Sequence, residues 1–113
     1  MEQRPAADVV RVELEGELLA ESRTCIQLIE GGHPPRYYFP RADLKLQYLT
    51  RSHTTTECPF KGTANYFNIC IGDHVLPDAV WTYESPFDEY LGIKDHVAFY
   101  TERFLQLTLT AGE

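Results

Sequence analysis

The clearest β-hairpin of the chain is predicted by residues 66–83, YFNICIGDHVLPDAVWTY. Apolar side chains occupy every second position from Phe67 to Ile71, which is the spacing of a strand with one buried face. Gly72-Asp73 provides a turn, and a second strand is expected from His74 to Tyr83. Pro77 cannot donate a backbone hydrogen bond, so it marks a bulge or an edge in that second strand. The stretch therefore favours a fold built from antiparallel strands.

Other parts of the chain show the same alternation, or a short apolar run that ends at turn residues. These patterns predict strands at residues 10–14, 18–22, 24–30, 44–49, 96–100 and 104–110, and an extended or edge segment at residues 36–39. No stretch keeps a helical period beyond a turn or two, and Pro40–Asp43 and Glu84–Tyr90 suit a short helical turn or a loop. We therefore expect an all-β fold with one or two short helical turns, arranged as a sandwich or partly open barrel of about seven to eight short strands.

Length, composition and charge limit the class of protein. The 113 residues, 43% of them hydrophobic, are enough for one core and too few for two. We expect a flexible N-terminal tail at residues 1–8 and a single β domain at 9–110. The net charge of −7 repels phosphate backbones, so no nucleic-acid partner is expected. Without an apolar run of ~20 residues or a secretory signal, we expect a cytoplasmic protein with no membrane partner. The oligomeric state stays open.

The cysteines and histidines argue against a metal site. Cys25, Cys58 and Cys70 form an odd set without a C-x-x-C pair, which is typical of reduced thiols rather than of disulfides or zinc ligands. The spacings of the four histidines match no standard zinc motif. Glycine-rich phosphate-binding motifs are missing from the sequence. We therefore expect no metal and no cofactor.

Residues 52–62, SHTTTECPFKG, gather hydroxyl, thiol, carboxylate, imidazole and ammonium groups without an apolar pattern. We interpret them as a functional loop on the β scaffold. Pro59 favours a turn from Cys58 to Lys61, and Gly62 can adopt the positive φ that often closes such a turn. If the protein is an enzyme, Cys58 and Lys61 are the candidate catalytic residues, as nucleophile or acid/base.

Each candidate also has a purely structural interpretation. A free cysteine such as Cys58 commonly packs as a small buried apolar residue. Lys61 and Arg36 are either ligand-binding cations or solvated surface charges. Trp81 and Tyr83 share a strand face with a small residue, a pattern that suits core packing and also suits the wall of a pocket.

The leading hypothesis is a domain that binds a small polar or anionic ligand in a pocket around the Thr-x-Thr-x-Cys-Pro-x-Lys-Gly segment. Cations would attract the ligand, hydroxyls would bond to it and aromatic rings would form apolar walls. Beside Cys58 and Lys61, the expected lining residues are Arg36, Tyr38, Thr54, Thr56, Tyr66, Trp81 and Tyr83. Two alternatives stay open: an enzyme that uses Cys58 or Lys61, and a protein-interaction module that uses a strand edge and the aromatic segment around Tyr37.

Several motifs of the chain are specific enough to compare with a known family. They are Tyr37-Tyr38-Phe39-Pro40, Thr54-x-Thr56-x-Cys58-Pro59-x-Lys61-Gly62-x-Ala64-x-Tyr66 and Ala79-x-Trp81-x-Tyr83-x-x-Pro86. They resemble the family called domain of unknown function 427, and the resemblance implies a compact, mainly β single domain of cytoplasmic type. The family is sometimes labelled nucleotidyltransferase-like. Nucleotidyl transfer needs carboxylates that bind a metal ion and a loop that binds phosphate, and neither can be recognised in this sequence.

Overall fold

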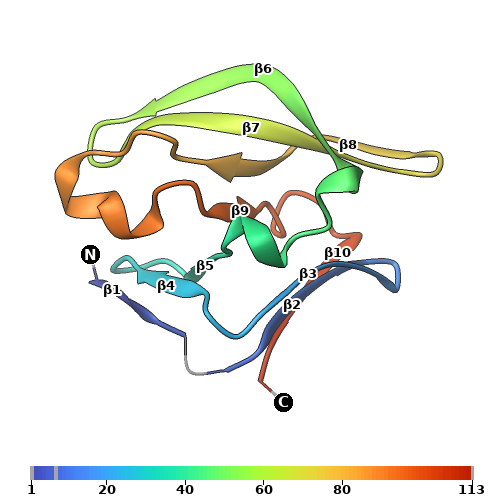
Figure 1. The fold of residues 1–113 in the computed structure, drawn as a ribbon, viewed down its shortest axis with the longest axis horizontal. Coiled ribbons are helices and arrows are strands. Elements are labelled where there is room, and N and C mark those ends of the chain that lie inside the picture. Colours follow the sequence, from blue (N-terminus) through green and yellow to red (C-terminus); the bar gives the residue numbers. More distant parts are fainter. Residues whose placement is uncertain (1, 7, 113) are drawn as a thin grey trace.

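The computed structural model describes residues 2–6 and 8–112, whose strands form two layers, a four-stranded sheet over two three-stranded sheets (Figure 1). The orders are β6-β7-β8-β9, β1-β4-β5 and β10-β2-β3, and every pairing of these strands is antiparallel. The strands are β1 (Glu2–Pro5), β2 (Val10–Leu14), β3 (Glu17–Ser22), β4 (Ile26–Ile29), β5 (Arg36–Tyr38), β6 (Leu49–Cys58), β7 (Gly62–Ile71), β8 (His74–Thr82), β9 (Val97–Phe99) and β10 (Leu107–Ala111). The helical turns are η1 (Arg41–Asp43), η2 (Leu46–Tyr48) and η3 (Asp88–Ile93).

The all-β prediction is confirmed, with ten strands in the described residues instead of about seven to eight. The predicted hairpin is β7–β8, and Gly72-Asp73 forms its turn. Phe67 pairs with Val80 and Ile69 pairs with Leu76, so β8 carries extra residues around Pro77 and the predicted bulge is present. None of the described helices is long and apolar enough to cross a membrane.

A pair of backbone hydrogen bonds joins the two layers at Phe39 and Val97. The Phe39 N–H donates to the Val97 carbonyl at 2.7 Å, and the Val97 N–H donates to the Phe39 carbonyl at 2.9 Å. Both side chains are buried. In the segment between η1 and η2, the Lys45 N–H donates to the Leu19 carbonyl of β3 at 2.8 Å. The strands of the described residues form three separate sheets, and no strand pairing closes them into a barrel. The fold is therefore an open sandwich.

Buried side chains gather in two clusters. The central cluster includes Val10, Val12, Leu14, Leu19, Phe39, Ile69, Val80 and Val97. The aromatic cluster comprises Leu28, Tyr38, Ala64, Trp81, Tyr83, Tyr90, Ile93 and Ala98. Successive side chains of an extended segment point to opposite sides. For this reason Tyr38 belongs to the aromatic cluster while Phe39, the next residue, belongs to the central one.

The loop predicted at residues 52–62 is a strand for most of its length, whereas its functional role is untested. β6 extends to Cys58, and only a short turn at 59–61 separates it from β7. β6 lies at the edge of its sheet and is largely exposed, so polar side chains are tolerated on both of its faces. Threonine is β-branched and favours strands. A polar strand at an edge therefore lacks the apolar alternation by which strands are recognised.

The strand predicted at residues 44–49 is also wrong. Leu44 forms an isolated bridge with Ala20, η2 follows at Leu46–Tyr48, and β6 begins at Leu49. The Leu49 N–H donates to the Leu46 carbonyl, which closes the turn that carries the chain from one layer to the other. The alternating apolar residues at 44–49 therefore belong to a turn between the two layers and not to a strand.

The first residues are more regular than the expected flexible tail. Glu2–Pro5 forms β1 and pairs with β4 in register, with Glu2 opposite Ile29 and Pro5 opposite Ile26. The strand is held by its backbone ladder and carries no apolar alternation, which is why the sequence pattern does not reveal it.

Gly62 sets the entry into β7. Its φ is +117°, a conformation that side chains rarely adopt. A Cβ built there would lie 3.4 Å from the Ser85 carbonyl oxygen and 3.6 Å from the Pro86 Cα. The neighbouring Lys61 carbonyl accepts a hydrogen bond from the Phe87 N–H at 2.8 Å. The turn and the segment after β8 are therefore packed backbone against backbone.

We expect Gly62→Ala to lower the free energy of unfolding by about 1–3 kcal/mol, because a residue with a Cβ is strained at a φ of +117°. Gly31→Ala is the matched control, since a Cβ at Gly31 meets nothing within 4 Å. Its effect should stay within about 0.5 kcal/mol. Urea unfolding of the two variants measures the difference, and equal midpoints would contradict the role of Gly62.

Candidate functional site

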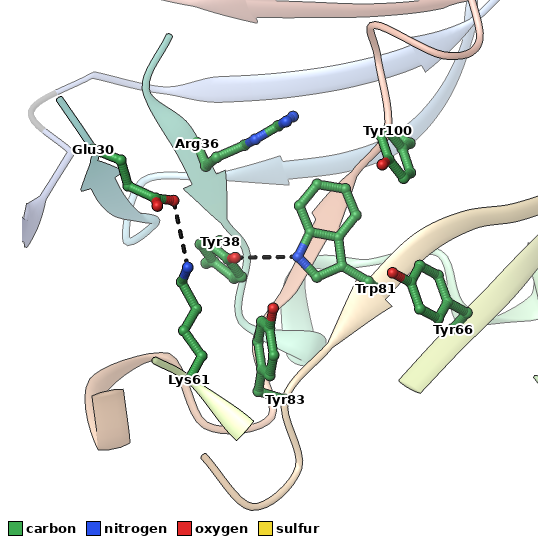
Figure 2. Close-up of a pocket in the computed structure, with 8 residues that line it drawn as sticks. All are labelled: Glu30, Arg36, Tyr38, Lys61, Tyr66, Trp81, Tyr83 and Tyr100. Atoms are coloured by element: carbon green, nitrogen blue, oxygen red, sulfur yellow. Dashed lines mark hydrogen bonds and ion pairs between the residues drawn. The ribbon is translucent and has the colours of Figure 1, made fainter. Parts of the chain in front are cut away.

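A cavity of about 210 Å³ opens between the two layers, beside the aromatic cluster. Figure 2 shows that its walls come from both layers: Arg36 and Tyr38 of β5 face Tyr66 of β7 and Trp81 of β8. Lys61 enters from the turn between β6 and β7. The lining residues are Glu30, Arg36, Tyr38, Lys61, Tyr66, Trp81, Tyr83 and Tyr100.

Lys61 is the buried cation of this cavity. Only 7% of its side chain is exposed, and its Nζ lies 3.4 Å from Oε1 of Glu30. The Nζ is also 5.5 Å from the centroid of the Tyr90 ring, a cation–π distance. Strong hydrogen bonds from an ammonium group to a carboxylate are shorter, at about 2.7–2.9 Å. The ion pair with Glu30 is therefore loose, and Lys61 retains the capacity to bind a second acceptor.

Trp81 and Tyr38 fix each other at the centre of the site. The indole Nε1 of Trp81 donates to the Tyr38 hydroxyl at 3.1 Å, and the two rings are arranged edge to face (Figure 2). Burial raises the pKa of Tyr38 to about 12, so the hydroxyl stays protonated at neutral pH. Because both residues are buried, this bond orders the wall of the cavity rather than its rim.

Arg36 is the second cation. Its Nη1 donates to Oε1 of Glu102 at 2.8 Å, and this hydrogen bond raises the pKa of Arg36. The same contact holds the pKa of Glu102 below its usual value. The guanidinium stacks 5.1 Å from the Trp81 ring centroid and 6.0 Å from that of Tyr100. Two cations and one carboxylate thus line the cavity of a protein whose net charge is −7.

Cys58 is not among the residues that line the cavity. It is half-buried against the aromatic cluster, and its thiol contacts the Tyr83 hydroxyl. Desolvation raises the pKa of Tyr83 above its ordinary value, so this tyrosine is neutral and a poor base at neutral pH. A catalytic role for Cys58 stays a prediction, since a reactive cysteine needs a base or a cation beside its sulfur. The packing role of Cys58 is the one that the geometry supports.

The two threonines have separate places. Thr54 is exposed on β6, and its hydroxyl donates to Oδ2 of Asp78 at 2.8 Å, away from the lining residues. Ser52 also donates to the Asp78 carboxylate, so these hydroxyls tie the β6 bulge to β8. The Thr56 hydroxyl lies 3.0 Å from the Tyr66 hydroxyl and thereby positions one wall residue. Neither threonine is among the residues that line this cavity, and their role in ligand binding stays a prediction.

Of the expected site residues, the structure brings Arg36, Tyr38, Lys61, Tyr66, Trp81 and Tyr83 around one cavity. Their role in ligand binding stays a prediction. Glu30 and Tyr100 are the lining residues that sequence reasoning missed. Glu30 directly follows β4 and Tyr100 directly follows β9. A search for polar and aromatic side chains at the ends of predicted strands would have found both. Among the described residues, no three His, Cys, Asp or Glu side chains gather where they could hold a metal ion.

The fold and the cavity define a small antiparallel β-sandwich domain with an aromatic, positively charged pocket between its layers. The chain belongs to the family described as Domain of unknown function (DUF427), whose sequence profile matches residues 2–109. The family resemblance drawn from the motifs is thereby confirmed. A comparison with curated proteins gives no match.

We expect Tyr38→Phe to lower the free energy of unfolding by about 1–3 kcal/mol, because it leaves the buried Trp81 N–H without an acceptor. Tyr37→Phe is the control: Tyr37 is half-buried and accepts one bond from Gln27 at 3.3 Å. Its loss should cost at most about 1 kcal/mol. Chemical denaturation followed by Trp81 fluorescence compares the two, and an equal cost would contradict the assigned bond.

Stability should fall in alkali. The unfolded phenols of Tyr38 and Tyr83 ionise near pH 10, whereas burial keeps them protonated to higher pH in the folded state, to about pH 12 for Tyr38. Above pH 10 the unfolded state therefore holds fewer protons, and the free energy of unfolding decreases as pH rises. Urea unfolding between about pH 8 and about pH 11 measures this loss, which should be smaller in Tyr83→Phe. A pH-independent free energy in the wild type would contradict the burial of these hydroxyls.

Proposed function

We propose that the cavity binds a small aromatic carboxylate. The observation that carries this proposal is the buried Lys61, whose side chain is 7% exposed and whose ion pair with Glu30 spans 3.4 Å. A charged amine is costly to bury unless it is well paired. A ligand carboxylate within hydrogen-bond distance of Nζ would complete the pairing that Glu30 supplies only in part.

The aromatic walls favour a planar ligand. Trp81 and Tyr100 pack edge to face with centroids 4.9 Å apart, and Tyr38 meets Trp81 in the same manner. Such rings offer apolar faces together with hydroxyl and N–H groups at their edges. Arg36 covers the Trp81 ring, and this places a second cation near any anion that enters. A planar ring would pack against the aromatic walls, and its carboxylate would pair with Lys61 or Arg36.

The volume limits the size of the ligand. Sites for drug-sized molecules usually measure about 300–1,000 Å³, and this cavity measures about 210 Å³. A single-ring acid fits that space better than a nucleotide does. The size of the cavity therefore agrees with the lack of a phosphate-binding motif in the sequence.

Benzoate and its neutral counterpart benzamide test the proposal. Trp81 is the one tryptophan of the chain, so its indole N–H gives a single resolved signal in a proton–nitrogen NMR spectrum. We expect benzoate to shift this signal saturably and benzamide to bind at least about tenfold more weakly, because only benzoate carries a charge for Lys61. Equal binding of the two probes would contradict the proposed role of charge.

Lys61→Met and Lys94→Met form the matched pair of variants. Methionine keeps the length and apolar contacts of the lysine stem and removes its charge. Lys61→Met should weaken benzoate binding by at least about tenfold, whereas Lys94, an exposed lysine outside the lining, should be replaceable without loss. Melting curves verify that both variants are folded. Benzoate binding to Lys61→Met as tight as to the wild type would place the site elsewhere.

A further inference from the structure

A second cavity lies beside the central cluster, apart from the site of Lys61. It has a volume of about 220 Å³ and is lined by Arg41, Leu44, Leu46, Leu49, Phe67 and Val97. These residues come from η1, η2 and the strands β6, β7 and β9 with the segments between them. None of them lines the first cavity. Five of the six are apolar, so the cavity has an apolar lining with one cation, Arg41.

The apolar wall is open to solvent. The exposed fraction of Leu46 is 54%, and Leu49 and Phe67 are only half-buried, whereas Leu44 and Val97 belong to the buried core. Apolar surface left in water is unfavourable relative to burial. A ligand with an apolar body would cover Leu46 and remove this exposed surface, since Leu46 lies at the accessible side of the cavity.

The charged end of the cavity is built and held in place. Nε of Arg41 donates to the Asp95 carbonyl at 2.8 Å, and its Nη2 donates to the Thr82 hydroxyl and to Glu84, each at 3.3 Å. These bonds fix the guanidinium while its Nη1 has no hydrogen-bond partner in the described part of the chain. A guanidinium has five donors, so Arg41 keeps capacity for an acceptor.

Arg51 adds a second guanidinium over the same ring. The guanidinium carbons of Arg41 and Arg51 lie 5.5 Å and 5.6 Å from the Phe67 centroid. Arg51 donates to both oxygens of Glu84 at 3.0 Å and 2.7 Å, which holds the pKa of Glu84 below its usual value. One carboxylate therefore serves two guanidinium groups, and the cluster keeps an excess positive charge beside an apolar cavity.

We propose that this cavity binds a short aliphatic carboxylate, with its chain against the leucines and Phe67 and its carboxylate on Arg41 and Arg51. The volume of about 220 Å³ lies below the roughly 300–1,000 Å³ of sites for drug-sized molecules, which favours a short chain. The charge excess selects an anion over a neutral or cationic amphiphile. This site is independent of the one proposed for aromatic acids.

Octanoate and octanol are the matched probes, followed by methyl NMR signals of Leu44, Leu49 and Val97. Octanoate should shift these signals saturably and bind at least about fivefold more tightly than octanol, because only octanoate carries an anion for the two arginines. The indole signal of Trp81, which reports on the other cavity, should not move at the same concentrations. No saturable shift, or octanol binding as tight as octanoate, would overturn the proposal.

Variants locate the binding to this cavity. Leu46→Glu places a charge at the accessible side and should abolish octanoate binding, while Leu105→Glu, a substitution at a leucine that is 87% exposed elsewhere, should not. Arg51→Gln should weaken binding by at least about threefold, with Arg23→Gln as its exposed control. These four positions are exposed, so the variants should fold, as melting curves will verify. Octanoate binding unchanged in Leu46→Glu, or lost equally in Leu105→Glu, would overturn the assignment of the site.

Discussion

The bridge between Phe39 and Val97 is the contact on which the rest of the arrangement depends. Its two backbone hydrogen bonds, 2.7 Å and 2.9 Å long, hold β5 against β9 and so join one layer to the other. Because the bridge is buried, water does not compete for its donors and acceptors. The two neighbours in sequence, Tyr38 and Phe39, are then committed to different clusters. The aromatic cavity lies on the Tyr38 side, and Val97 lines the second cavity.

Strands with one buried face could be predicted from the sequence, and strands without one could not. β2 alternates fully, with Val10, Val12 and Leu14 buried, and the β7–β8 hairpin has both alternation and a turn signal. In contrast, β1 and most of β6 have side chains that are largely exposed, so their only strand signal is the backbone ladder, which leaves no pattern in side-chain hydrophobicity. Edge position is decided by tertiary pairing and is absent from local sequence.

The site could be predicted to the extent that its members lie near conspicuous motifs. Lys61 follows the proline of a tight turn, and Trp81 and Tyr83 share a strand, so each stood out in the sequence. Glu30 directly follows a strand, but the local sequence does not mark it as the partner of Lys61, because that 3.4 Å contact joins residues thirty-one positions apart. Thr54 is the opposite case: its position in the motif suggests a ligand contact, whereas its hydroxyl donates to Asp78 in the structure. Side-chain chemistry names candidates, and only the fold decides which of them converge.

The bulge of β6 has a consequence for how molecules of this protein meet one another. The outer edge of β6 is the longest unpaired edge in the four-stranded sheet, and a straight edge of that kind invites another chain to add a strand. Here the ladder is interrupted between Arg51 and Thr55, and Asp78 anchors the displaced segment through Ser52 and Thr54. An incoming strand would meet a kinked template that it cannot follow in register. The three side chains that shape the sheet thus also make the outer edge of β6 a poor template for an added strand.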